Sequence, residues 1–187
     1  MLLQRATAII IALFCFGASI SSYAVEYKTI EWTDLIPKED LEALKNPPEW
    51  IQNIPDGSEE DNISNMITNL IGKASDSRYQ QALSSTEVKK EYDKQSIRIP
   101  GFIVPLEFDD TQLITEFFLV PYFGACIHVP PPPPNQMIHA IYKKGIRVDA
   151  LYTPFWLNGT LHTKILKNEV GTSAYSMKVT KIELYEE

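Results

Sequence analysis

The side chains most able to bind a metal or to act as a nucleophile lie in one short segment. Residues 117–139 read FFLVPYFGACIHVPPPPPNQMIH and contain Cys126, His128 and His139. A thiolate is a soft ligand and an imidazole is a borderline one, so a cysteine and histidines held close together suit zinc or copper. The segment therefore predicts a transition-metal site with these three ligands, and zinc is preferred over copper.

Such ligands need a backbone that directs them to one point. Residues 116–127 are strongly apolar and predict a β-strand. Side chains alternate between the two faces of a strand, so Gly124, Cys126 and His128 are expected to share one face, with the two ligand Cβ atoms about 7 Å apart. Gly124 would leave space beside them. If the next strand runs antiparallel, His139 returns toward Cys126.

A run of five prolines, Pro130 to Pro134, separates the two expected strands. Proline has no backbone N–H and favours an extended conformation, so the run is expected to stiffen the exit from the first strand. Asn135 and Gln136 restore hydrogen-bond donors and acceptors where the chain turns back. A fourth metal ligand, His162, could come from a strand further along the chain.

The same residues allow other interpretations. Cys126 could be a small buried apolar side chain, with His128 hydrogen-bonded at a strand end. Cys126 could also be the nucleophile of a thiol enzyme, although His128 on the same strand would point parallel to it, which is a poor geometry for a general base. Finally, Pro130 to Pro134 could form a ridge that docks a partner, which would make the chain a metal-free protein-interaction module.

The N-terminus predicts export. Arg5 precedes the uncharged residues 6–20, and Ser22-Tyr-Ala24 fits a cleavage site, so residues 1–24 have the plan of a secretory signal peptide. The apolar stretch is about 15 residues long, shorter than the roughly 20 of a transmembrane helix. We therefore expect a periplasmic protein that is not integral to the membrane. Cleavage would leave Cys126 as the one cysteine, which marks it as a reactive thiol, an intermolecular bridge or a metal ligand.

The charge balance argues against nucleic acid as a partner. The full chain has 17 Lys and Arg against 24 Asp and Glu, a net charge of −7. Removing residues 1–24 takes away Arg5 and no acid, so the mature charge is 16 minus 24, or −8. Phosphate backbones are bound by basic faces, so this balance disfavours nucleic acid, whereas it permits a cation or a basic partner.

Two regions follow the signal peptide. Residues 25–95 are polar and predict an extension with short helices over 37–45, 63–71 and 78–90. Residues 96–187 predict a mainly β domain, with a turn over 143–145 and strands over 97–104, 116–127, 136–142, 146–152, 155–166 and 174–185. A phase shift of the apolar alternation predicts a bulge near Thr180. Such strands favour a small OB-like antiparallel barrel, with a β-sandwich as the alternative.

Three segments of the second region resemble one bacterial family. They are Ile99–Leu106, which reads IPGFIVPL, Gly124–Gln136, which reads GACIHVPPPPPNQ, and Trp156–Leu161, which reads WLNGTL. The resemblance covers residues 96–186, and its middle motif is long enough to be specific. The family consists of small exported proteins known only as a domain of unknown function, the ZrgE-like proteins.

The resemblance implies a role in metal handling. Family members are described as periplasmic, and some are encoded beside ABC-type transport components in zinc-responsive gene clusters. This implies an accessory role in zinc uptake or homeostasis, with membrane transporter subunits as partners. His139 and His162 lie outside the matching motifs. No reaction is established for the family, so we expect a binding protein rather than an enzyme. The residues that the middle motif supports are Cys126, His128, Asn135 and Gln136.

Overall fold

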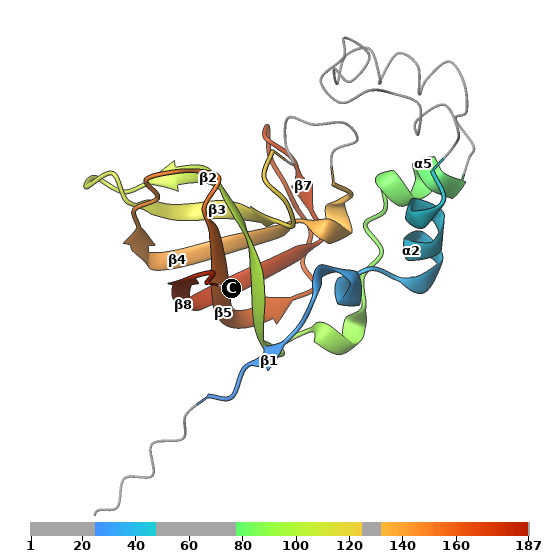
Figure 1. Cartoon of the computed structure of the whole chain (residues 1–187), viewed down its shortest axis with the longest axis horizontal. Helices are drawn as coiled ribbons and strands as arrows, with labels where there is room; N and C mark the ends of the chain where they lie inside the picture. The colour runs from blue at the N-terminus through green and yellow to red at the C-terminus, as the bar shows by residue number, and fades with distance from the viewer. Residues whose placement is uncertain (1–24, 48–77, 125–131, 187) are drawn as a thin grey trace, which may run out of the picture.

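Figure 1 shows the computed structural model, which describes residues 25–47, 78–124 and 132–186. Several predicted features lie outside the described residues: the signal peptide over residues 1–24, the helix over 63–71, and the ligand candidates Cys126 and His128. These features stay predictions, whereas His139 and His162 can be placed in the fold.

The described residues form a closed barrel. Six of their strands make one sheet in the order β1, β2, β3, β4, β8, β5, and the pairing of β5 with β2 closes the last five into a barrel. Within the barrel, only β4 and β8 run parallel among these strands. This architecture confirms the predicted mainly β, OB-like barrel rather than the sandwich. The strands are β1 (Lys28–Thr29), β2 (Ser96–Phe108), β3 (Ile114–Val120), β4 (Ile138–Ile146), β5 (Pro154–His162) and β8 (Tyr175–Leu184).

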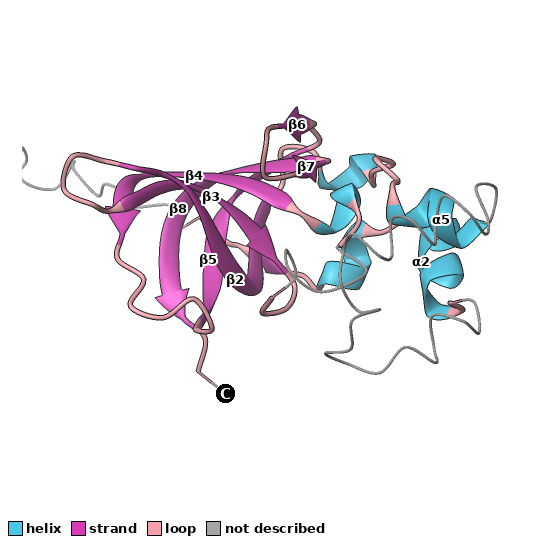
Figure 2. Cartoon of the chain, turned by 90° about the horizontal axis from the view of Figure 1, so that it is seen from above, coloured by secondary structure: helices cyan, strands magenta, loops and turns pink. Residues whose placement is uncertain are grey.

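The helical elements lie together beside one end of the barrel (Figure 2). They are η1 (Trp32–Leu35), α2 (Lys38–Lys45), α5 (Arg78–Leu83), η3 (Lys90–Tyr92) and η4 (Pro134–Gln136), and a hairpin of β6 (Leu166–Lys167) and β7 (Thr172–Ser173) stands near them. The helix predicted over 78–90 is shorter than expected. It ends at Leu83, and Ser84 donates to the backbone carbonyl of Gln80 from both its N–H and its hydroxyl.

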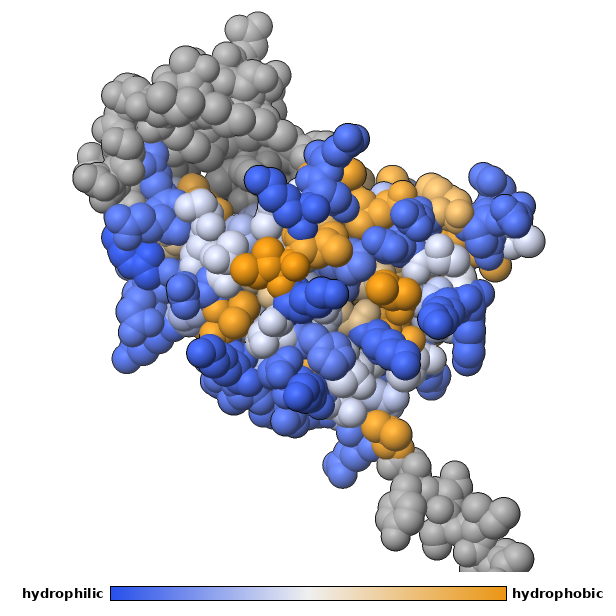
Figure 3. Space-filling view, turned by 180° about the vertical axis from the view of Figure 1, so that it is seen from behind, coloured by the Kyte–Doolittle hydropathy of each residue, from blue (hydrophilic) through white to orange (hydrophobic). Residues whose placement is uncertain are grey.

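The alternation of apolar side chains fills the barrel. Ile97, Ile99 and Ile103 of β2 are buried in one core with Tyr175 and Met177 of β8. The alternate residues of these strands, such as Arg98, Phe102 and Ser176, are more exposed. On the face seen in Figure 3, apolar residues form separate patches between hydrophilic side chains, as expected for a protein surface. The core therefore lies inside the barrel, and outward-facing side chains are available for binding.

The predicted bulge in the last strand is confirmed. Gly159 of β5 pairs with Val179, and Asn158 pairs with Lys181, so Thr180 is the extra residue on β8. The two strands approach closely here. A Cβ atom at Gly159 would lie 2.5 Å from the carbonyl oxygen of Lys178, which explains why glycine occupies this position.

The strand predicted over 116–127 is too long. β3 ends at Val120, and residues 121–124 form bends and turns. Pro121 cannot donate a backbone hydrogen bond to a neighbouring strand, and Gly124 has φ of +78°, a left-handed conformation that strands do not use. The prediction that Gly124 shares one strand face with Cys126 and His128 is therefore wrong.

The turn predicted over 143–145 and the strand over 146–152 are also wrong. β4 continues through these residues to Ile146, which pairs with Ile114, and residues 147–153 contain no strand. The register shifts between Glu116 and Ile114, and Gly145 has φ of +68° in this irregular stretch. Glycine here allows a bulge within the strand instead of a turn that ends it.

Tyr175 connects the barrel to the N-terminal extension. Its hydroxyl accepts a hydrogen bond from the backbone N–H of Lys89 (2.7 Å) and donates one to the carbonyl of Leu35 (3.0 Å). The side chain is fully buried. Both partners precede β2, so this one hydroxyl joins two parts of the extension to strand β8 of the barrel.

Stability is expected to fall as the pH rises from 10 to about 12. Burial raises the pKa of the Tyr175 hydroxyl from 10.0 to about 12. The unfolded chain loses this proton near its ordinary pKa, so the stabilising contribution is complete below that pH and is lost as the pH approaches the folded-state value. Urea unfolding across this pH range should show a shallower decline for Tyr175→Phe than for the wild type, and equal slopes would contradict this role.

Candidate functional site

The outer faces of β4, β8 and β5 bring together side chains that are far apart in the sequence. His139 of β4 is in register with Ser176 of β8, which is in register with His162 of β5. The neighbours of these residues along each strand are core residues, so the row faces outward. The next outward-facing row consists of Ile141, Lys178 and Thr160.

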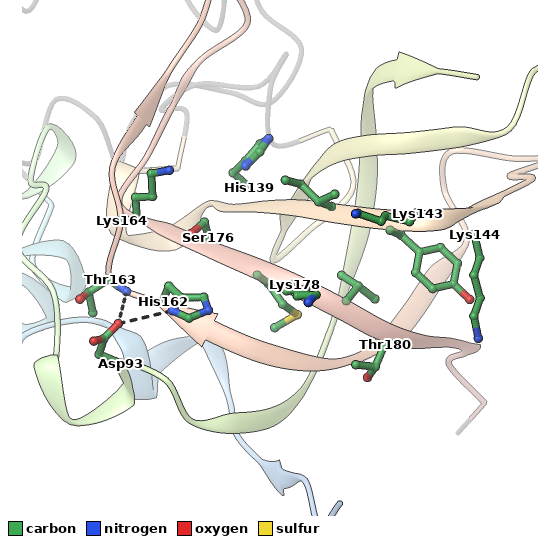
Figure 4. A pocket seen from close by; sticks show the side chains of 14 residues that line it. Asp93, His139, Lys143, Lys144, His162, Thr163, Lys164, Ser176, Lys178 and Thr180 are labelled. Carbon is green, nitrogen blue, oxygen red and sulfur yellow. Dashed lines mark hydrogen bonds and ion pairs between the residues drawn. The ribbon is translucent and has the colours of Figure 1, made fainter. Parts of the chain in front are cut away.

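A groove of about 880 Å³ lies over these rows (Figure 4). This volume is within the range of small-molecule sites, about 300–1,000 Å³. His139 and His162 line the groove together with Asp93, so the structure brings two of the three histidines to one surface. Four lysines also line it, Lys143, Lys144, Lys164 and Lys178.

His139 is held firmly by its neighbours on β3. The side chain is 4% exposed, its Nε2 lies 2.6 Å from Oε1 of Glu116, and its ring contacts the ring of Phe118 in an edge-on geometry. The carboxylate fixes the orientation of the imidazole. The contact with Glu116 engages Nε2 of the imidazole, so Nδ1 is the ring nitrogen that this carboxylate does not occupy.

His162 is held more loosely. Its Nδ1 lies 3.9 Å from Oδ1 of Asp93, and both side chains are partly exposed. The backbone N–H of Thr163 donates to the same carboxylate oxygen (3.0 Å) and is the main cause that lowers the pKa of Asp93 below its ordinary value. Asp93 is therefore ionised at neutral pH and balances part of the positive charge at this end of the groove.

Comparison with known proteins identifies the family. Residues 32–184 match the family described as "Protein of unknown function (DUF3299)". The chain belongs to the DUF3299 family. A crystal structure of a DUF3299 family protein from Pseudomonas aeruginosa PAO1 is similar to it, with a TM-score of 0.62 and 32% sequence identity, over 87% of this chain and 99% of that chain. No protein of curated function matches the sequence of this DUF3299 chain.

The predicted metal ligands of this DUF3299 chain are only partly placed. His139 and His162 line the groove, whereas Cys126 and His128 lie outside the described residues. Within the described ranges, no three His, Cys, Asp or Glu side chains are grouped so that they could hold a metal ion. In the same ranges, no helix is long and apolar enough to cross a membrane.

Asn135 and Gln136 have a structural role in the DUF3299 fold. Both are buried. The amide nitrogen of Asn135 donates to Oδ2 of Asp40 (3.1 Å) and to the carbonyl of Glu87 (3.2 Å), and that of Gln136 donates to the carbonyl of Trp32 (2.8 Å). These bonds attach the segment before β4 to the N-terminal extension.

The described part of the proline run is not an exposed ridge. Pro132 and Pro133 are buried, and Pro134 begins η4. Pro132 and Pro133 line a small cavity of about 230 Å³ with residues of α2 and α5, including Leu44 and Leu83. These prolines therefore pack within the DUF3299 fold, and they give the interaction-module hypothesis no exposed surface.

Two features of the groove were missed in the sequence. Glu116 is 23 residues from His139, and only the register of β3 with β4 brings the pair together. The four lysines are spread over residues 143–178 and resemble ordinary surface charges until the strands are aligned. The alternation of Ser176, Lys178 and Thr180 along β8 was the available signal, because it marks an outward polar face.

Proposed function

We propose that this DUF3299 protein binds a transition metal, zinc before copper, through His139 together with Cys126 and His128. We further propose that it does so in the periplasm, as an accessory of a membrane transport system. The observation that carries the proposal is the pair of His139 with Glu116, in which Nε2 lies 2.6 Å from a carboxylate oxygen.

A histidine that binds a metal usually has its second ring nitrogen on a carboxylate or carbonyl, which fixes the ring and makes the ligating nitrogen more basic. Glu116 supplies such a partner at 2.6 Å. The pair is supported from both strands, since Glu116 lies on β3 and His139 on β4. A zinc site needs more ligands than one histidine, and these must come from elsewhere in the chain.

The sequence supplies those ligands close by. Cys126 and His128 belong to the connection between β3 and β4, which returns to the barrel one residue before His139. The charge of the ligands matters here, because the four groove lysines disfavour a bare cation nearby. A Cys126 thiolate would supply negative charge at the metal, and the Glu116 carboxylate adds to it.

The compartment and the partner have separate support. The first 24 residues have the plan of a signal peptide, and the motif from Gly124 to Gln136 resembles that of exported proteins encoded beside zinc-responsive transport components. Both features fit a protein that holds a metal outside the inner membrane and works with a transporter subunit.

Elemental analysis tests the metal site directly. The wild type, purified without chelator and then supplied with zinc, should retain about one metal ion per chain. Cys126→Ser and His139→Gln should lose it, because each removes a ligand. Glu116→Gln should weaken zinc affinity about 10- to 100-fold, as expected for a residue that orients a ligand.

His162→Gln is the matched control, because His162 lines the same groove but is not among the proposed ligands. It should keep the metal. A wild type that binds neither zinc nor copper would contradict the proposal. Equal metal content in the wild type and in Cys126→Ser would also contradict it.

A further inference from the structure

The groove over β4, β8 and β5 is lined by more positive than negative side chains. Lys143, Lys144, Lys164 and Lys178 line it. Among the described residues, the ion pairs within 4.0 Å involve other side chains, so none of these four ammonium groups has a carboxylate partner there. In a chain of net charge −7, four unpaired lysines around one groove are a local inversion of the overall charge.

The lysines are distributed along the groove rather than at one point. Lys178 stands in the middle, in register with Ile141 and Thr160, while Lys164 lies near His162 at one end (Figure 4). Lys143 lies at the other end, four residues along β4 from His139. With a rise of about 3.4 Å per residue, the groove positions span about 14 Å. Such spacing suits a ligand longer than a single inorganic anion.

The lining between the lysines is partly apolar. The side chain of Ile141 is 42% exposed, although its outward position on β4 is surrounded by polar residues. Ser176 contributes a hydroxyl group that can donate to an anionic oxygen at the histidine end. The groove therefore offers cationic groups, hydroxyl donors and an apolar contact at the same time.

We propose that this groove binds a small organic phosphate, with its phosphate oxygens on the ammonium groups and its organic part on Ile141. Lysine is a common phosphate-binding side chain, and charge-assisted hydrogen bonds to phosphate are strong. A long nucleic acid would meet the acidic remainder of the surface, whereas a small ligand inside the groove is shielded from distant charges by salt. This site uses described residues only and does not depend on the metal proposal.

Isothermal titration of the chelator-treated protein with geranyl diphosphate tests the site, since removing metal ions excludes binding through a metal. Geranyl diphosphate should bind more tightly than inorganic triphosphate, which lacks the apolar part, and than geraniol, which lacks the phosphates. Lys178→Ala and Lys143→Ala should each raise the Kd about tenfold, the effect of losing one charge-assisted hydrogen bond. Lys38→Ala on α2 removes the same charge away from the groove and should leave the Kd unchanged.

Vesicles of phosphatidylcholine with and without phosphatidic acid show whether the ligand is a lipid phosphate or a free phosphate ester. Binding that requires phosphatidic acid and is lost in Lys178→Ala supports the site with a lipid phosphate as ligand. Binding of geranyl diphosphate without vesicle binding supports it with a free phosphate ester. The proposal is overturned if no phosphate probe binds, if Lys178→Ala and Lys38→Ala behave alike, or if a single-stranded oligonucleotide binds as tightly as geranyl diphosphate.

Discussion

Gly159→Ala is expected to lower the free energy of unfolding by about 3 kcal/mol, the upper end of the usual cost of overpacking. An added Cβ would lie 2.5 Å from the carbonyl oxygen of Lys178, 2.9 Å from Cγ of Met177 and 3.0 Å from Cα of Val179. Two of these three atoms belong to the backbone of β8, so relief requires a shift of the strand at its bulge. Urea unfolding of the wild type and the variant measures the loss.

Gly171→Ala is the matched control for this prediction. The nearest atom to an added Cβ there is the terminal methyl carbon of Met137 at 3.2 Å, which belongs to a flexible side chain and can move. We expect a change within about 0.5 kcal/mol. If the two variants lose the same stability, the close approach of β5 to β8 does not explain the glycine at position 159.

Asp40→Ala is expected to lower the free energy of unfolding by about 2 kcal/mol. Asp40 lies on α2, is 2% exposed, pairs with Arg78 of α5 and accepts a hydrogen bond from Asn135. The alanine variant leaves the Asn135 amide with one acceptor fewer in a buried site. The loss is less than that of a fully buried ion pair because the Arg78 side chain is 47% exposed and water can replace its partner.

Glu42→Ala is the control on the same helix. Its carboxylate is exposed and lies 4.0 Å from Lys45, so its removal should cost no more than about 0.5 kcal/mol. A double-mutant cycle with Asn135→Ala adds a second test: the two losses should not add, because both variants break one network. Strict additivity would show that Asp40 and Asn135 act independently.

Much of the barrel could be predicted from local patterns. The alternation of apolar residues in β2 and β8 has a period of two, and the phase shift at Thr180 is visible in the sequence because the extra residue moves Ile182 to the opposite parity. The ends of β3 and β4 could not be predicted from such patterns. Lys143-Lys-Gly145 resembles a turn, yet pairing of Ile146 with Ile114 extends the strand through it. Pairing partners of this kind are set by tertiary structure, and local preference does not reveal them.

The residues of the candidate site could also be predicted only in part. His139 could be selected because it follows an unusual motif, and its outward position on an antiparallel neighbour of β3 follows from alternation. Its partner Glu116 could not be selected, because a strand pair can have several registers and only one places these residues together. Asn135 and Gln136 belong to the same motif, and only the tertiary structure reveals that their buried amides hydrogen-bond to the N-terminal extension.

The position of β8 in the barrel has a consequence for how the molecule is made. β8 is the last strand of the described chain, yet it lies between β4 and β5 and pairs with both. During synthesis, β4 and β5 therefore keep an unpaired edge until β8 has left the ribosome, and contacts distant in sequence must then form together, which slows folding. The barrel therefore closes only once β8 has been added between them.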